Sequence, residues 1–414
     1  MFIEKILNEK IIDRQFYLDK IKSFLGSPLI KVLIWQRRVW KSTILKSIIQ
    51  KLYKNNEIKK ENFFYINKEL ILFDHIKNYD DLKNEFLEFL KIKKDWKFFV
   101  WIDEVQEIEW WEKFINGILA EYAWESEIFI TGSNSFLLSW ELSTFLTWRY
   151  IEFNIFSLSY SEFSIFKNEV KSKELFLEYL KFWGLPAIFK MDFSEDMIFP
   201  YLLWVYNTIL IKDIISNHNI KNINFFKDLY KYTLTNIWNI VSWKSIKDYL
   251  KSQQIGIWNE TVLNFLLYAQ ETFLLNKVYS VNPESKKIFE IYNKYYVSDL
   301  WIRNSLVWFD FARDIWKLIE NYVYIELKRH SYDVIIWRLK SWKEIDFIAT
   351  KNGITKYFQV CYLLWWEITI KREYSSLEEV SDNWEKYVVS FDDIDFGISK
   401  WIKHINVMKI EEVL

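Results

Sequence analysis

Cysteine, glycine and long apolar runs are scarce in this chain. A single cysteine, Cys361, excludes an intrachain disulfide and favours a reducing compartment, so a cytoplasmic protein is expected. No run of about eighteen apolar residues occurs, so neither a membrane-spanning helix nor a membrane partner is expected. The chain begins with MFIEKILNEK, which has acidic side chains and no apolar core, unlike a secretory signal. The net charge of −1 provides no overall attraction to nucleic acid or anionic lipid.

The composition is otherwise that of a folded protein of two or three domains. The 414 residues are 51% hydrophobic and 27% charged, which excludes a disordered chain. Tryptophan is the anomaly, since 23 tryptophans accompany only 7 glycines. A chain of this length normally holds roughly 29 glycines. Tryptophan therefore fills the numerical gap that glycine leaves.

Many of the tryptophans stand where a turn or loop is expected. Such positions need a residue that tolerates a positive φ or a close backbone approach, which describes glycine. Some bacterial lineages read the UGA codon as glycine, whereas a common alternative code reads it as tryptophan. We hypothesise that most tryptophans here are glycines in the natural protein; the plainer alternative is a set of surface and core aromatics. Trp110 fits the glycine pattern, whereas Trp111 and Trp101 fit genuine aromatics.

Short apolar strands alternate with helices in the first part of the chain. An amphipathic lead-in helix is expected over residues 1–25, and another helix from about Ser42 to Tyr53. Continuous apolar strands between helices indicate a parallel sheet that is buried on both faces. The expected strands are 32–34, 63–66, 98–102, 127–131 and 150–155.

The second part of the chain changes character along its length. Residues 157–220 are expected to be helical, with a break at Gly184 and Pro186. Short helices follow, and then an extended stretch over Thr272–Val281. A helix is expected around Lys317–Lys328, followed by strands at 334–336, 345–350 and 357–364.

The segment from Ile34 to Thr43 follows a strand and opens a helix. With glycine at positions 35 and 40 it becomes the Walker A pattern, in which backbone N–H groups wrap around phosphates. Lys41 would reach the β- and γ-phosphates of ATP, and the Ser42 hydroxyl would bind Mg²⁺. As written, with two indoles, the loop should not close on ATP; the alternative is a basic turn. The expected nucleotide-binding residues are Trp35, Gln36, Arg37, Arg38, Val39, Trp40, Lys41, Ser42 and Thr43.

A Walker B partner should be an apolar strand that ends in acidic residues. Strand 98–102 is followed by Asp103 and Glu104, about 60 residues after the loop. Asp103 would hold Mg²⁺ through water, and Glu104 would orient or activate the attacking water. The alternative is a helix N-cap made by the same aspartate.

Two further positions are candidates for sensing the phosphate. Asn134 or Ser133, after the next strand, is a candidate contact to the γ-phosphate or the attacking water, and an N-cap is the equal alternative. Arg149 begins the last strand of the core. It is a candidate sensor of phosphate in its own chain or in a neighbour's, and a structural salt bridge is the alternative.

At this point the chain resembles bacterial and archaeal AAA+ superfamily ATPases that carry a C-terminal domain of unknown function with a restriction-endonuclease-like core. The matching segments include IWQRRVWKST, FFVWIDEVQEIEWWEKF, FWGLPA, IWKLIENYVYIEL and EIDFIA, and the resemblance covers nearly the whole chain. In that family most of these tryptophan positions are glycine. The resemblance implies an ATP-binding and ATP-hydrolysing core.

The resemblance also implies the division of the chain. The fold class is α/β, with a P-loop parallel-sheet core, a helical and winged-helix middle, and a C-terminal restriction-endonuclease-like domain. The expected segments are an N-terminal helix (1–25), the ATPase core (26–156), a helical lid (157–224), a winged-helix-like segment (225–287) and the C-terminal domain (288–414).

A restriction-endonuclease-like site needs carboxylates on a helix and two strands, together with a lysine. Glu320 lies on the expected helix, with Glu326 on the same element, and Asp346 lies on the second strand. The third strand should carry Glu-x-Lys, but it has Gln359 and Cys361. Lys371 or Arg372 is a candidate replacement for the missing charge. The expected site is therefore degenerate, with a structural or DNA-docking role, and nuclease activity is not expected.

The remaining motifs carry weaker signals. Cys361 is expected to be an inert core thiol, and the four histidines have no metal-ligand spacing. The recognition helix of the winged-helix segment would be Thr261–Ala269, which holds Asn264 and Tyr268 but no lysine or arginine. The expected phosphate contacts are Lys244, Lys247 and Lys251, and a protein-packing role for this segment is an equal alternative.

Three functions remain, in this order. The first is an ATPase that uses ATP and Mg²⁺ as a switch or motor on an unknown partner, with DNA or another protein as candidates. The second is a DNA-binding module that ATP only regulates. The third is a pseudo-ATPase scaffold, which follows if Trp35 and Trp40 are genuine. The oligomeric state is not encoded in any recognisable pattern.

Overall fold

The chain divides into two compact units, Met1–Phe156 and Ser157–Leu414, in a computed structural model. Each unit has its own sheet and its own buried core. The structure describes residues 2–133, 146, 149–182, 184–191, 194–218, 220–237, 246, 248, 259–281, 293–307, 311–339, 341 and 343–414.

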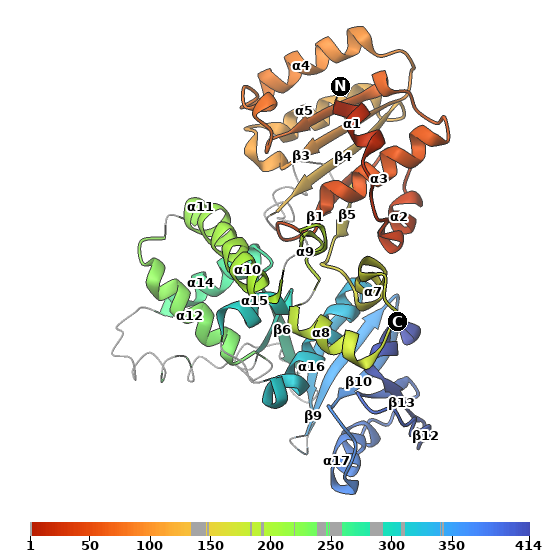
Figure 1. The fold of residues 1–414 in the computed structure, drawn as a ribbon, viewed down its shortest axis with the longest axis vertical. Helices are drawn as coiled ribbons and strands as arrows, with labels where there is room; N and C mark the ends of the chain where they lie inside the picture. Colours follow the sequence, from red (N-terminus) through yellow and green to blue (C-terminus); the bar gives the residue numbers. More distant parts are fainter. Residues whose placement is uncertain are drawn as a thin grey trace. The chain divides into compact units, whose positions relative to one another are not determined.

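The first unit is a five-stranded parallel sheet in which helices connect the first four strands along the chain (Figure 1). The strand order is β2-β3-β4-β1-β5, and every neighbouring pair is parallel. Its strands are β1 (Ile30–Ile34), β2 (Phe63–Asn67), β3 (Phe98–Asp103), β4 (Ser126–Gly132) and β5 (Tyr150–Asn154). Its α-helices are α1 (Phe2–Asn8), α2 (Gln15–Lys22), α3 (Lys41–Lys54), α4 (Tyr79–Ile92) and α5 (Trp111–Tyr122).

The burial of these strands explains their composition. Every residue of β1 and of β4 is buried, because both strands lie inside the sheet and are covered on both faces. Helices α4 and α5 pack together over an aromatic cluster in which Phe64, Phe86 and Phe114 are in ring contact. The expected parallel sheet of a P-loop protein is confirmed.

The expected single lead-in helix is wrong, because the segment forms two helices. Residues between α1 and α2 leave the helical path and bind α3 through their side chains. Asp13 accepts hydrogen bonds from Ser47, and its carboxylate pairs with Lys51 at 2.9 Å. Arg14 donates to the carbonyl of Val39 at 3.2 Å, so the break is used for contacts that a continuous helix would not reach.

The second unit begins with helices. The expected helical stretch is present, with its break at Gly184. Only glycine fits there, because a Cβ would stand 2.6 Å from the Leu158 carbonyl oxygen. A π-helix, Leu210–Ile215, continues α10. The helices of this part are α7 (Tyr160–Lys167), α8 (Lys173–Phe182), α9 (Ala187–Lys190), α10 (Glu195–Ile209), α11 (Ser216–His218), α12 (Ile223–Thr235) and α14 (Asn259–Glu271).

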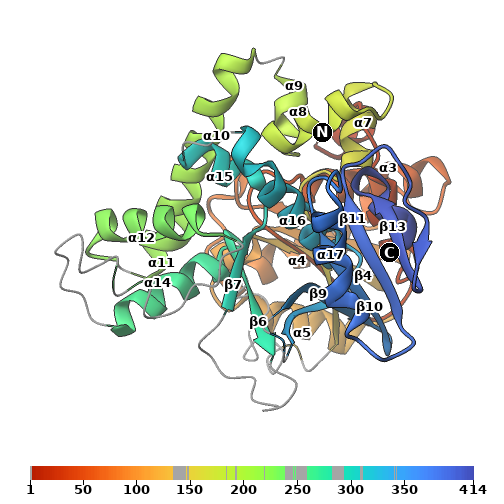
Figure 2. The ribbon, with the colours of Figure 1, turned by 90° about the horizontal axis from the view of Figure 1, so that it is seen from below.

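A mixed sheet of eight strands forms the rest of the second unit, in the order β12-β13-β11-β10-β9-β8-β6-β7. Figure 2 shows helices α12 and α14 standing apart from the C-terminal strands, as they do in Figure 1. The strands are β6 (Leu275–Val281), β7 (Asn293–Val297), β8 (Asp333–Arg338), β9 (Glu344–Lys351), β10 (Ile354–Val360), β11 (Glu385–Ser390), β12 (Ile398–Ser399) and β13 (Ile402–Asn406). The helices are α15 (Leu300–Leu306), α16 (Phe311–Arg329) and α17 (Glu367–Glu378).

The pairing of β6 links two segments that the sequence separates. β6 forms an antiparallel hairpin with β7, and its end pairs in parallel with β8. The sheet therefore continues across the expected limit at residue 287, while the expected domain division stays a prediction. Much of the expected winged-helix segment, including Lys244, Lys247 and Lys251, lies outside the described residues.

One helical stretch, Asp196–His218, is long and apolar enough to cross a membrane by length and composition alone. It was not expected from the sequence, because its apolar run is interrupted by polar residues. Buried residues make up 44% of its most apolar window, and its first helix packs against α15. The core helix of a globular domain has these same properties.

Candidate active site

The loop between β1 and α3 is built as the sequence predicts. It leaves the carboxyl end of β1 at Ile34 and enters α3 at Lys41. The Lys41 ammonium is buried and donates to the carbonyl oxygens of Trp35 and Gln36, at 2.8 and 3.0 Å. The loop therefore wraps around its own lysine, which is the arrangement that a phosphate-binding loop needs.

The backbone of this loop adopts angles that glycine favours. Trp40, the N-cap of α3, lies in the left-handed region with φ 65° and ψ 42°. Arg38 also has a positive φ, of 72°. A left-handed conformation costs an L-residue about 1–2 kcal/mol. The Trp35 indole is buried, with its ring centre 4.0 Å from that of Phe156.

Asp103 stands at the centre of the site. Ser42 donates to its Oδ2 at 2.6 Å and Asn67 at 3.2 Å, while the Thr131 hydroxyl donates to Oδ1. Burial raises the pKa of Asp103 to about 6, although the hydrogen bonds from Ser42 and Thr131 oppose this shift. The predicted Walker A serine and Walker B aspartate are thus in direct contact across 61 residues of sequence.

Glu104 lies beside this aspartate in a left-handed conformation, with φ 54°. Its Oε2 accepts from Gln106 at 2.7 Å and from Ser133 at 3.0 Å, and it lies 3.6 Å from the Arg37 guanidinium. Burial alone would raise the pKa of Glu104, but Lys41 and Arg37 outweigh it and hold the pKa below its ordinary value. The carboxylate is therefore ionised at neutral pH.

The other predicted loop residues divide by exposure. Gln36 and Val39 are buried, whereas Arg38 is exposed and Arg37 turns toward Glu104. The Thr43 amide donates to the Trp40 carbonyl at 3.1 Å, inside the first turn of α3.

The sequence analysis missed Asn67, Thr131 and Gln106. Asn67 ends β2 and stands opposite Asp103 in the register of the sheet. Thr131 lies near the end of β4, the other neighbour of β3. The carboxyl ends of adjacent parallel strands meet at one edge of a sheet, so polar residues at those ends were the available signal.

The predicted phosphate sensors differ in where they lie relative to the site. Ser133 reaches Glu104, as stated above, whereas Asn134 lies outside the described residues. Arg149 precedes β5 at its amino end, where the Arg149 carbonyl accepts from Ile30. The loop begins at the other end of β1, which pairs in parallel with β5. The structure therefore does not bring Arg149 to the loop of its own chain; a role in a neighbouring copy stays a prediction.

Comparisons with known proteins agree with this geometry. A family model described as an AAA domain matches residues 27–164. An uncharacterized protein of Haemophilus influenzae is 30% identical over 389 residues, which are 93% of this chain and 94% of that protein. The chain belongs to the AAA family. An uncharacterized protein of Methanocaldococcus jannaschii is 29% identical to this AAA protein over 424 residues. The match covers 96% of this chain and 91% of that protein.

A solved structure also matches part of the chain. The Walker-type ATPase PABY2304 of Pyrococcus abyssi has 16% sequence identity to this AAA protein and a TM-score of 0.49. The match covers 73% of this chain and 99% of that one.

The expected nuclease residues of the AAA protein gather in one cavity of about 1120 Å³ in the second unit. Glu320 of α16, Asp346 of β9, Gln359 of β10 and Cys361 all line it. Arg372 also lines it and pairs with Glu373 at 2.5 Å, whereas Lys371 is exposed. Burial raises the pKa of the Cys361 thiol well above its usual range, as expected for an inert core thiol.

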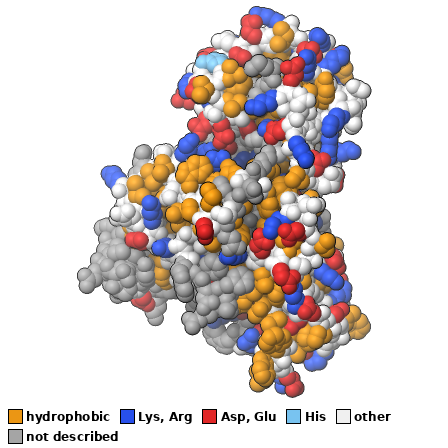
Figure 3. Space-filling model, in the orientation of Figure 1, with side chains coloured by type: hydrophobic (Ala, Val, Ile, Leu, Met, Phe, Trp, Pro, Cys, Tyr) orange, Lys and Arg blue, Asp and Glu red, His pale blue; other side chains and the backbone are white. Residues whose placement is uncertain are grey.

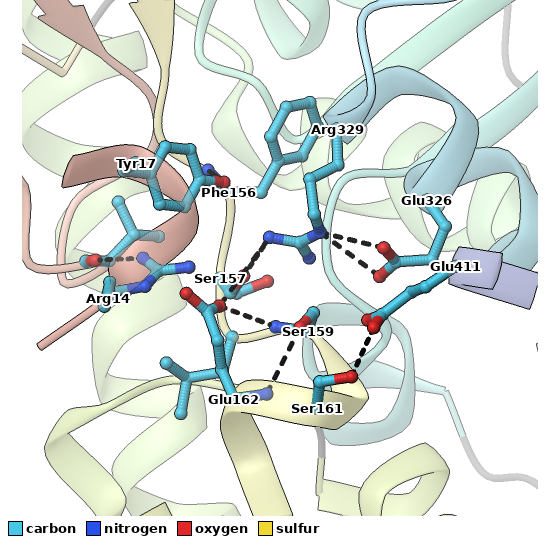
Figure 4. Close-up of polar contacts among 12 residues, drawn as sticks. Arg14, Tyr17, Phe156, Ser157, Ser159, Ser161, Glu162, Glu326, Arg329 and Glu411 are labelled. Carbon is cyan, nitrogen blue, oxygen red and sulfur yellow. Dashed lines mark hydrogen bonds and ion pairs between the residues drawn. The ribbon is translucent and has the colours of Figure 1, made fainter. Parts of the chain in front are cut away.

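Glu326 does not join this cavity. It lies six residues further along α16 and bonds Arg329, at 3.1 and 3.2 Å (Figure 4). Arg329 also donates to the carbonyl of Ser157 at 2.8 Å, at the start of the second unit. Figure 4 also shows the capping box at the start of α7. The Glu162 carboxylate accepts from the Ser159 amide, and the Glu162 amide donates to the Ser159 hydroxyl. Arg329, which Glu326 holds in place, therefore anchors the beginning of the second unit to α16.

The described tryptophans of the AAA protein range from buried to exposed. Trp101, Trp111 and Trp301 are buried, as genuine aromatics would be, and so is Trp35 of the loop. Hydrophobic side chains gather over α17 at the lower end of Figure 3, where Trp365 and Trp366 are exposed. The tryptophans exposed by 43% to 89% are Trp96, Trp110, Trp124, Trp204, Trp316, Trp365, Trp366, Trp384 and Trp401.

Proposed function

We propose that this AAA protein binds and hydrolyses ATP with Mg²⁺ and uses the cycle as a switch or motor on a partner. The 2.6 Å contact between Ser42 and Asp103 carries the proposal. These are the two side chains that a P-loop protein uses to hold Mg²⁺, and they meet although they are far apart in sequence. DNA is a candidate partner, and a second protein is another.

The chain's own residues supply the remaining roles. Mg²⁺, held near Ser42 and Asp103, would neutralise charge on the phosphates. Lys41 would exchange the loop carbonyls for phosphate oxygens, because its ammonium donates to backbone acceptors that the loop can release. Glu104 would orient the attacking water and accept its proton, since its carboxylate is ionised.

We further propose that positions 35 and 40 are glycine in the natural protein. The left-handed backbone at Trp40 supports this, because a tryptophan there is strained and a glycine is not. The positive φ values of Trp110 and Trp401 extend the same argument beyond the loop. The nucleotide sequence tests this proposal directly: UGG codons at both positions would exclude it.

ATP binding by two full-length proteins tests the function. One is the chain as written and the other carries Trp35→Gly and Trp40→Gly. We expect only the glycine protein to bind Mg·ATP and turn it over, and Lys41→Ala in that protein to abolish binding. Gln50→Ala, a change elsewhere on α3, is the matched control and should leave turnover within about twofold. Failure of the glycine protein to bind ATP would overturn the proposal.

A pseudo-ATPase scaffold is the second candidate, favoured by one observation. The Trp35 indole is buried in the loop and packed on Phe156, so the chain as written forms a stable loop around an aromatic core. UGG codons at positions 35 and 40 in the gene, together with no ATP binding by the chain as written, would establish this candidate.

A further inference from the structure

A buried lysine lies among the carboxylates of the second unit's cavity. Lys294 of β7 is only 7% exposed in its side chain. Its ammonium is 3.2 Å from Glu320 Oε1 and 2.5 Å from Glu344 Oε1, on α16 and β9 respectively. Three elements that are distant in sequence therefore bring one cation to two anions.

The two carboxylates of the expected nuclease site are already engaged. Glu320 Oε1 accepts from the Tyr296 hydroxyl at 2.7 Å in addition to Lys294. Asp346 Oδ2 accepts from the backbone amide of Val360 at 2.8 Å. Burial, together with the charge of Glu320, raises the pKa of Asp346, and the charge of Lys294 opposes this shift. Lys294 is thus the counter-charge that offsets the cost of burying these carboxylates.

The third strand offers no replacement ligand. Both ends of the Gln359 amide are used, because Nε2 donates to Glu373 at 3.1 Å and Oε1 accepts from Ser376 at 3.2 Å. Cys361 stands where the motif places its lysine, and its thiol contacts only the Val389 carbonyl at 3.8 Å among the hydrogen bonds of the described residues. Among those residues, no group of three or more histidine, cysteine or acidic side chains has the geometry of a metal site.

These contacts do not fit the Mg²⁺ ion that a restriction-endonuclease-like site implies. Mg²⁺ needs near-octahedral oxygen ligands at about 2.0–2.1 Å, and Lys294 already binds Glu320, one of the two carboxylates that such an ion would need. We propose that Lys294 is a built-in cation that takes the place of the metal, so that the C-terminal domain holds its carboxylate cluster together without Mg²⁺. The inference does not depend on the proposed ATPase function.

Mn²⁺ binding by the nucleotide-free full-length protein tests the inference. Every protein in the experiment carries Ser42→Ala and Asp103→Asn, so that the nucleotide site loses both side chains that would hold a metal ion. We expect no stoichiometric Mn²⁺ binding with Lys294 in place. Lys294→Met keeps the length of the side chain and removes its charge. It should create one Mn²⁺ site and bind Mn²⁺ at least about tenfold more tightly than the protein with Lys294 does. Adding Glu320→Gln to this variant should remove the new site.

The control is Lys343→Met, a lysine of the same cavity that pairs with Glu379 instead. It should create no Mn²⁺ site. Stoichiometric Mn²⁺ binding by the protein with Lys294, lost in Asp346→Asn, would overturn the inference, and this arm needs no variant of Lys294. Magnesium-dependent cleavage of DNA that Asp346→Asn abolishes would overturn it as well. A folded Lys294→Met protein that gains no site would do the same.

Discussion

At the scale of single residues, the backbone φ angle shows where a side chain is strained. Trp110 is the N-cap of α5 with φ 61°, and 71% of its side chain is exposed. The indole therefore adds little burial while the backbone is held in a conformation that glycine adopts freely.

We expect Trp110→Gly to stabilise the first unit by about 1 kcal/mol, because it removes the left-handed strain. The midpoint of urea unfolding measures this. Trp124 is the control, since it is similarly exposed but is not among the residues with a positive φ. Trp124→Gly should give no gain, and equal gains at both positions would contradict the argument from backbone strain.

Glu104 is the second residue whose environment predicts its behaviour. In the protein with glycine at positions 35 and 40, we expect Glu104→Gln to lower kcat by about 100-fold or more while ATP still binds. Steady-state kinetics and ATP titration measure the two effects. Glu107→Gln, at an exposed carboxylate of the same short helix, should leave kcat unchanged. A similar loss in both variants would remove Glu104 from the catalytic role.

At the scale of elements, α16 carries two carboxylates with different surroundings. Glu320 faces the cavity, and Glu326 is fully buried against Arg329. Burial raises the pKa of Glu326 to about 7, although Arg329 opposes the shift. The folded protein therefore holds this proton more tightly than the unfolded chain does.

Glu326 makes the free energy of unfolding depend on pH. Because the folded pKa is raised, the contribution of Glu326 is most favourable below the unfolded pKa of about 4.5 and is lost as the pH rises toward 7. We expect Glu326→Gln to remove this slope, so that its stability relative to the wild type rises by up to about 3 kcal/mol over that range. Urea unfolding at several pH values measures the difference. Glu367→Gln, at an exposed position of α17, should keep the wild-type slope; a slope unchanged by Glu326→Gln would refute the assignment.

At the scale of the whole molecule, two cores divide the chain. The first unit contains the proposed nucleotide site, and the second contains the Lys294 cluster. A ligand stabilises the folded state that binds it, by about 2.7 kcal/mol at one hundred times Kd.

We therefore expect calorimetry of the glycine protein to show two unfolding transitions, of which Mg·ATP raises only one. Lys41→Ala should abolish that shift and leave both transitions in place without nucleotide. An equal shift of both transitions would show that the units unfold together.

The sequence by itself determined the parts of this protein that depend on local order. The strand-loop-helix at Lys41 and the acidic pair at Asp103 were predictable, because each motif is written in consecutive residues. The parallel sheet was predictable as well, because buried strands are continuously apolar. The tryptophans at expected turns were visible for the same reason, since turns have a local signature.

Tertiary structure alone decided which distant side chains meet. Asn67 and Thr131 reach Asp103 because neighbouring parallel strands end at one edge of the sheet. Lys294 reaches Glu320 and Glu344 because a hairpin strand, a helix and a sheet strand converge. Such contacts depend on strand order and helix packing, which are set by the burial of whole elements and have no signature in a short stretch of sequence.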